Sequence, residues 1–222
     1  SVAVGRELQR RGHQVRIAVQ PALVDFAESS GLTAVPYGPE LDEFLNEDFL
    51  RNFWAQLVRR PAASLRELWA PIIRCWPETS RTLMSLVDGA DLLSTGLNFE
   101  QPAANVAEYY RIPLITIHHF PMRPNGQLFP ALPSPAVRLA GTVSDWLFWR
   151  ATKDVDNAQR HDLGLTRATV RSSTRIAERG SLEIQAYDAV CFPGLAEEWA
   201  KWAAHRPFVG ALTMELATEA DA

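Results

Sequence analysis

Apolar and polar positions along the chain alternate between the spacing of a helix and that of a strand. Amphipathic helices are predicted over 1–11 and 21–30, and apolar runs typical of buried strands over 14–20 and 33–37. Pro21 suits the first turn of its helix, and Gly31 suits the residue just beyond the end of it. This order of elements indicates an α/β protein.

A long helical region follows. Two apolar stripes with helical spacing, over 44–58 and 65–87, predict two extended helices. Pro71 and Pro77 fall inside the second stripe, and we expect a kink or a break there because an internal proline removes a backbone hydrogen bond.

The alternation resumes in the second half of the chain. Strands are predicted over 91–95 and 113–118 with a helix over 98–110 between them, an order that implies a parallel pair with a right-handed crossover. Proline-rich 120–135 predicts an extended loop, 137–159 a helix, and arginine-studded 165–181 a mobile loop. Short strands are predicted over 182–186, 189–192 and 207–211.

These elements predict a Rossmann-like parallel sheet flanked by helices, and the helix that opens the chain indicates that the first strand is missing from it. We expect one domain over 1–215, truncated at its start, and the beginning of an interdomain linker over 216–222.

Charge and cysteine usage exclude several classes of function. The chain has 22 basic and 26 acidic residues, a formal net charge of −4, which argues against a nucleic-acid partner. Cys75 and Cys191 lie far apart, so neither a disulfide framework nor a metal site is indicated. No apolar run approaches the roughly 18 residues that span a bilayer, and we expect a cytoplasmic protein.

Polar and aromatic residues follow the two clearest strands. Ligands of α/β proteins bind beyond the carboxyl ends of parallel strands, so these residues are the candidates for a binding site. A histidine there can orient a hydroxyl group or take its proton. The alternative is that the imidazoles are only hydrogen-bonded within the fold, and that the asparagine only caps its helix. The candidates are Thr95, Asn98, Phe99, Gln101, His118, His119 and Met122.

Other common signatures are absent or have a simpler interpretation. The sequence has no G-x-G-x-x-G, no G-x-x-x-x-G-K-[ST] and no G-x-S-x-G motif. The seven tryptophans mostly follow the helical stripes, so we expect them to pack in the core rather than to bind sugar or lipid.

Several segments resemble GT-B glycosyltransferases. The run 1–15 is similar to the first helix and second strand of that family, where the pattern reads P-x-x-A-L-A-x-E-L-x-x-R-G-H-x-V. Further similar segments are 34–38, 90–93, 107–113, 191–193 and 208–210. Actinobacterial members related to glycopeptide-antibiotic, glycopeptidolipid and sterol glycosyltransferases resemble the chain most closely.

The resemblance implies that the chain is the N-terminal, acceptor-binding half of such an enzyme. It places the acceptor cleft at 96–101 and 118–122, walled by helices around 53–76, and it places the catalytic base before Ser1. The nucleotide diphosphate sugar is then a co-substrate bound mainly by a C-terminal half beyond Ala222, and no further cofactor is needed.

The implied reaction is metal-independent transfer of a hexose to a hydroxyl of a hydrophobic acceptor such as a lipid, a glycopeptide or a sterol-like molecule. Peripheral contact with the inner face of the membrane is a further expectation. Two alternatives remain open at this stage. One is a non-catalytic α/β binding module with 41–88 as a docking surface, and the other is a nucleotide-sugar epimerase with an active-site histidine in this half.

Overall fold

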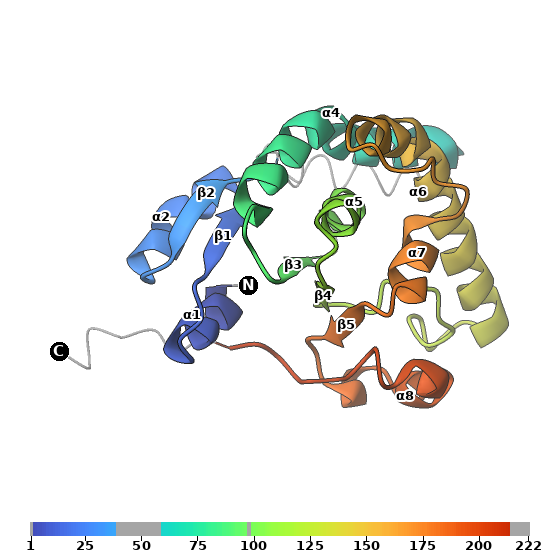
Figure 1. Cartoon of the computed structure of the whole chain (residues 1–222). Coiled ribbons are helices and arrows are strands. Elements are labelled where there is room, and N and C mark those ends of the chain that lie inside the picture. Colours follow the sequence, from blue (N-terminus) through green and yellow to red (C-terminus); the bar gives the residue numbers. More distant parts are fainter. Residues whose placement is uncertain (1, 39–58, 97–98, 214–222) are drawn as a thin grey trace.

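The computed structural model describes residues 2–38, 59–96 and 99–213, and within these ranges five parallel strands form two sheets (Figure 1). In the first sheet β1 (Arg16–Val19) pairs with β2 (Thr33–Pro36). The second has the order β3 (Leu93–Gly96), β4 (Leu114–His118), β5 (Leu182–Gln185). The predicted α/β class with parallel strands is confirmed.

The first sheet packs with the helices that the sequence places around it. These are α1 (Val2–Arg10) and α2 (Val24–Ser29), the latter preceded by a short 3-10 helix, Pro21–Leu23. Gly31, just past α2, has a φ of +81°, which an L side chain rarely adopts. The strands and α2 enclose a small apolar core. It contains Ile17 and Val19 of β1, Ala27 of α2, Ala34 of β2, and Leu32 just before β2.

Four helices lie on one side of the second sheet, and α8 (Leu195–Glu198) lies on the other (Figure 1). The four are α4 (Pro61–Val87), α5 (Glu100–Tyr110), α6 (Ser134–Asp162) and α7 (Ser172–Glu178). Their core contains Leu83, Val87, Ala103, Val106, Ala107, Leu114 and Ile176. Because α5 presents mostly alanines to this core, the neighbouring elements approach it closely.

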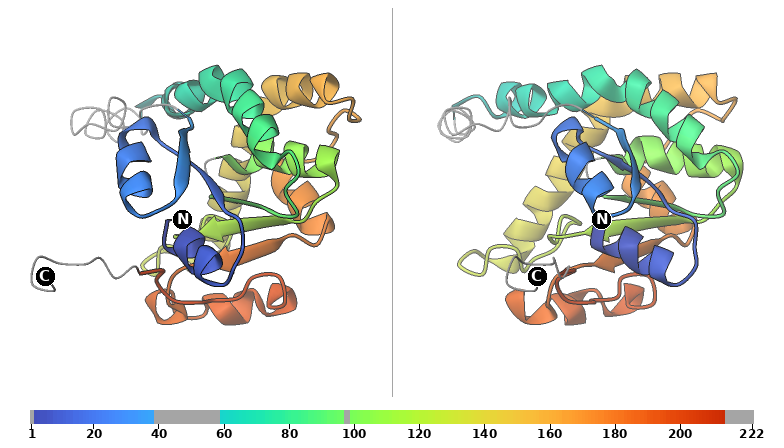
Figure 2. Two further views of the ribbon diagram at one scale, coloured as in Figure 1. Left: turned by 60° about the vertical axis from the view of Figure 1, so that its left-hand side comes forward. Right: turned by 90° about the vertical axis from the view of Figure 1, so that its left-hand side faces the viewer.

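Helix α4 runs without interruption through Pro71 and Pro77, so the expected disturbance is a bend and not a break. Figure 2 shows the change in direction along α4. Packing against α5 and α6 supports the turns that the prolines weaken, and Trp76 in this region donates from Nε1 to Gln159 Oε1 at 2.9 Å. The predicted helix over 44–58 lies outside the described residues.

A buried polar network joins α5, α6 and α7. Asn105 is fully buried and donates to Asp156 Oδ1 at 2.7 Å and to Gln159 Oε1 at 2.9 Å. Its own oxygen accepts from Arg160 at 2.9 Å and from Arg175 at 3.2 Å. The amide therefore links two guanidinium groups to a carboxylate that is itself fully buried.

The prediction of a mobile loop over 165–181 is wrong. Residues 172–178 form α7, in which Ile176 is fully buried in the core. Arg175 pairs with Asp156 at 3.1 Å, and Arg171 pairs with Asp145 at 3.0 Å. Two of the four arginines that made the segment look like a solvated loop are thus partners of acidic residues on α6.

The strand predicted over 189–192 is also wrong, because Ala189–Cys191 is a 3-10 helix. The Asp188 carboxylate accepts from the Val190 N–H at 2.9 Å, which favours a turn. The strand predicted over 207–211 is reduced to one parallel bridge between Phe208 and Gln185. None of the described helices is both long enough and apolar enough to cross a bilayer.

Candidate functional site

The loop after β4 turns alternate side chains toward solvent and toward the interior. His119, Phe120 and Met122 are exposed, whereas Pro121 and Arg123 are buried. Phe120 is 45% and Met122 52% exposed, which is high for side chains of this size and polarity. The loop thus presents an imidazole and two apolar side chains just beyond the carboxyl end of a central strand, where α/β proteins bind ligands.

Arg123 fixes this loop to the sheet and to α5. Its Nε donates to Glu183 Oε2 on β5 at 2.5 Å, and its Nη2 lies 3.0 Å from Glu100 Oε2 on α5. Glu183 is also paired with Arg206 at 3.1 Å. Burial alone would lower the pKa of Arg123, but the two carboxylates outweigh it and raise that pKa.

Glu100 stands at the first position of α5, where the helix dipole favours a negative charge. It pairs with Arg123 and also with Nε2 of His118, the last residue of β4. Burial alone would raise the pKa of Glu100, but the charge of Arg123 and the contact with His118 leave it below its ordinary value. The carboxylate therefore stays ionised in the interior.

Glu198 holds the same loop from the other side. Its two carboxylate oxygens accept from the Gly126 N–H at 3.0 and 2.9 Å, and Oε1 also accepts from Arg138 Nε on α6 at 2.8 Å. Within the loop, Asn125 donates to the carbonyl oxygens of Pro121 and Arg123 at 3.0 and 2.8 Å. These contacts brace the backbone of the loop, so the Cα positions that carry its exposed side chains are held relative to β4.

The structure places the predicted site residues in two environments. His119 and Met122 are exposed on the loop. Partial desolvation of the His119 imidazole lowers its pKa below the ordinary value, which favours the neutral imidazole. His118 is fully buried against Glu100 and does not reach solvent. Which of them contact an acceptor stays a prediction.

The other predicted residues follow β3. Thr95 pairs in register with Thr116 of β4, and its hydroxyl donates to the Gly96 carbonyl at 3.2 Å. Phe99 precedes α5 and packs edge-on against Tyr37, with ring centroids 4.7 Å apart. Gln101 is 4% exposed, and neither of its amide atoms has a partner among the described residues. Asn98 lies outside the described residues.

The spacing of residues in the sequence does not predict most of the ion pairs that hold this loop. Glu100, Arg123, Glu183, Arg206 and Glu198 are separated by up to 106 positions in the sequence, and charged residues are exposed in most proteins. One local signal was present: Arg123 lies between two prolines in a loop that otherwise carries no charge up to the start of α6. A single charged residue in such a stretch suggests a buried ion pair that holds the loop in place.

The acid sensitivity of the protein should depend on Glu198. Burial would raise its pKa, but Arg138 and the Gly126 N–H outweigh it, so the pKa lies below the ordinary value. The stabilisation is therefore complete above the ordinary carboxyl pKa and is lost as the pH falls below it. Urea unfolding of the Glu198→Gln variant should show a weaker loss of stability between pH 7 and about pH 3 than the unmodified protein. Equal losses in the two proteins would contradict the assignment.

Comparison with known proteins shows which proteins the chain resembles. No family model matches the chain. It is 54% identical to "Uncharacterized glycosyltransferase Rv1524" of Mycobacterium tuberculosis, over 99% of the chain and 52% of the relative. It is 49% identical to "Uncharacterized glycosyltransferase ML2348" of Mycobacterium leprae, over 99% of the chain and 51% of the relative. The chain thus spans about half the length of the curated relatives it matches.

Two solved structures share the fold. The glycotransferase of kitacinnamycin superposes with a TM-score of 0.60 at 17% identity, over 99% of the chain and 49% of that protein. CalG4, the calicheamicin glycosyltransferase, superposes with a TM-score of 0.53 at 18% identity, over 95% of the chain and 47% of that protein. The chain has the fold of about one half of a GT-B glycosyltransferase. More particularly, it is a homologue of the mycobacterial proteins that bear the name glycosyltransferase.

Proposed function

We propose that the chain is the acceptor-binding part of an enzyme that transfers a hexose from a nucleotide diphosphate sugar to a hydroxyl of a hydrophobic acceptor. The observation that carries the proposal is the braced loop after β4, which displays Phe120, Met122 and His119 beyond the strand end. Apolar side chains held in place suit a large apolar acceptor, such as a lipid, a glycopeptide or a sterol-like molecule.

The residues of the site suggest a division of tasks. The neutral imidazole of His119 can accept a hydrogen bond from the acceptor hydroxyl and orient it for attack on the sugar. We assign the removal of the hydroxyl proton and the binding of the donor pyrophosphate to parts of the whole enzyme that this chain does not span.

The test is an assay of the whole enzyme with a panel of nucleotide diphosphate sugars, with and without hydrophobic alcohols, which follows release of the nucleotide diphosphate. Acceptor-stimulated release is the expected result. Release that no acceptor stimulates, or no release at all, would contradict the proposal.

Variants test the place of the acceptor. Met122→Ala should raise the acceptor KM about tenfold, because about 1–2 kcal/mol of apolar contact is lost, and should leave the donor KM unchanged. Leu23→Ala is the matched control, since Leu23 is exposed to a similar extent, 47%, in the 3-10 helix before α2. Equal effects of the two substitutions would place the acceptor elsewhere.

A further inference from the structure

Two loops leave the same edge of the second sheet side by side. Strands β4 and β5 are parallel, and their last residues, His118 and Gln185, pair in register. The Ala186 N–H donates to the His118 carbonyl at 2.8 Å, so the segment 186–192 begins next to the loop after β4. Because ligands of α/β proteins bind beyond the carboxyl ends of parallel strands, this segment lies at the same edge as the candidate site.

An aromatic contact joins the two loops beyond the strand ends. The rings of Phe120 and Phe192 meet edge-on, with centroids 5.7 Å apart and planes at 83°. Edge-on pairs with centroids about 4.5–7 Å apart attract each other, because the positive edge of one ring meets the negative face of the other. The contact therefore favours one orientation of the Phe120 ring, although that ring is 45% exposed.

A buried cluster supports Phe192 from the inside. Its ring meets Tyr187 edge-on at 5.4 Å, and Tyr187 meets Phe208 at 5.6 Å. Tyr187 is buried, and its hydroxyl donates at 2.7 Å to Oε1 of Gln185, which is fully buried as well. Phe192 and Phe208 both pack against this apolar cluster. The cluster thus holds Phe192, and Phe192 in turn contacts the exposed ring of Phe120.

Hydrogen bonds fix the backbone on both sides of Phe192. The Phe192 N–H donates to the Ala189 carbonyl, and the Phe192 carbonyl accepts from the Leu195 N–H, both at 3.1 Å. Before it, the Val190 N–H donates to the Asp188 carboxylate at 2.9 Å. Leu195 is fully buried at the start of α8. The place of the Phe192 ring is therefore set by the fold itself.

We propose that Phe192 is a positioning residue for acceptor binding. It holds the Phe120 ring in the orientation in which this ring meets the apolar part of the acceptor, and it thereby makes the segment after β5 part of the acceptor site. The inference rests on the proposed function, since it concerns the site to which that function assigns the acceptor. Without Phe192 the Phe120 side chain gains rotamers that binding must then restrict, so the acceptor binds less tightly.

The experiment is a double-mutant cycle on the whole enzyme, with the hydrophobic alcohol that stimulates release most strongly as acceptor. Phe120→Ala should raise the acceptor KM about tenfold, because a large apolar contact is lost. Phe192→Leu should raise it about threefold and leave the donor KM and kcat unchanged. The double variant should show no larger acceptor KM than Phe120→Ala alone, because Phe192 acts through a ring that is then absent.

Two results of the cycle would overturn the assignment. An unchanged acceptor KM in Phe192→Leu would mean that Phe120 needs no support. Effects that multiply in the double variant would mean that Phe192 acts independently of Phe120.

A conservative variant separates positioning from a purely structural role. Phe192→Tyr keeps the edge-on ring and should have the acceptor KM of the unmodified enzyme. Leucine at this position keeps apolar bulk in the cluster but offers no ring to Phe120. If Phe192 only filled space, leucine would preserve the acceptor KM as well as tyrosine does.

Tyr110→Leu is the matched control. Tyr110 packs against the core and meets Tyr109 edge-on at 5.0 Å, and Tyr109 is 46% exposed, so this pair also has an inner and an exposed ring. The pair lies at the end of α5, which leads from the carboxyl end of β3 back to the start of β4 and so ends at the other edge of the sheet. The acceptor KM should not change, and a rise equal to that of Phe192→Leu would overturn the assignment.

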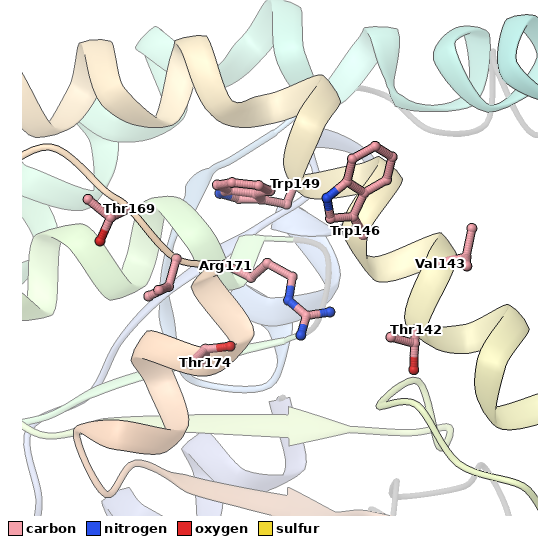
Figure 3. Close-up of a pocket in the computed structure, with 8 residues that line it drawn as sticks. Thr142, Val143, Trp146, Trp149, Thr169, Arg171 and Thr174 are labelled. Atoms are coloured by element: carbon pink, nitrogen blue, oxygen red, sulfur yellow. The ribbon is translucent and has the colours of Figure 1, made fainter.

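A second control lies on α6. Figure 3 shows Val143 and Trp146 in the wall of a groove with a volume of about 480 Å³. Trp146 is 48% exposed and so does not pack in the core as the spacing of the tryptophans predicts. Trp146→Leu should leave the acceptor KM unchanged. A rise as large as that of Phe192→Leu would mean that aromatic rings affect the KM wherever they lie, and would overturn the assignment.

The same measurements separate this inference from the proposed function. An unmodified enzyme that shows no acceptor-stimulated release refutes the proposed function and this assignment with it. An active enzyme whose acceptor KM does not respond to Phe192→Leu refutes the assignment alone.

Discussion

Replacing Arg123 with methionine should destabilise the protein by about 3–5 kcal/mol, because it removes the cation between two buried carboxylates. Glu100 and Glu183 are 6% and 1% exposed, so solvent cannot replace the lost guanidinium. His118 and Arg206 remain beside them but each already pairs with one carboxylate. Equilibrium unfolding in urea at neutral pH measures the effect.

The control for this result is Arg138→Met. Arg138 also pairs with a carboxylate that braces the loop, Glu198, but its side chain is 48% exposed, so we expect a loss of no more than about 1 kcal/mol. Arg123→Lys should fall between the two, since it keeps the charge but loses the forked geometry. Similar losses for the methionine variants at 123 and 138 would mean that the buried network does not carry the stability assigned to it.

Replacing Asn105 with alanine is the second change with a large expected effect, again about 3–5 kcal/mol. The amide makes four hydrogen bonds in the interior, one of them with Arg175 of α7. Its loss also leaves Asp156, Gln159 and Arg160 each without one partner. Since these residues lie on α6, the substitution should loosen the contact between α5 and the helices beside it. Urea unfolding again measures the loss.

Asn157→Ala is the matched control for this substitution. Asn157 is half-buried on α6, donates to the Lys153 carbonyl at 2.9 Å and accepts from the Ala168 N–H at 2.8 Å, so a loss of about 1 kcal/mol is expected. The same loss at both positions would show that the network around Asn105 contributes no more stability than the hydrogen bonds of a half-buried amide.

Both networks act on the geometry of the candidate site. The Arg123 network fixes the loop after β4 to β5 and α5, and the Asn105 network fixes α6 and α7 to α5. Rigid support of this kind keeps binding side chains in place before a ligand arrives and so reduces the entropy that binding costs. Variants in either network should therefore weaken acceptor binding as well as stability.

Local pattern was sufficient for much of this protein. The strands at 16–19, 33–36, 93–96, 114–118 and 182–185 all lie within or next to predicted runs, because apolar β-branched runs between turn residues have few other solutions. The expectation of a binding site at the ends of β3 and β4 also comes from the sequence, since parallel strands place their carboxyl ends on one edge of the sheet, and it stays a prediction.

Tertiary structure alone decided the rest. Residues 172–178 became a helix because Ile176 is buried in the core and Arg175 meets Asp156 on α6, two contacts that no local window contains. From the sequence alone one can predict where the loop after β4 begins, because the proline-rich segment 120–135 follows the strand directly. Only the folded chain brought Glu100, Glu183 and Glu198 around that loop, because pairing between distant charges depends on the packing of the elements that carry them and not on their spacing in the sequence.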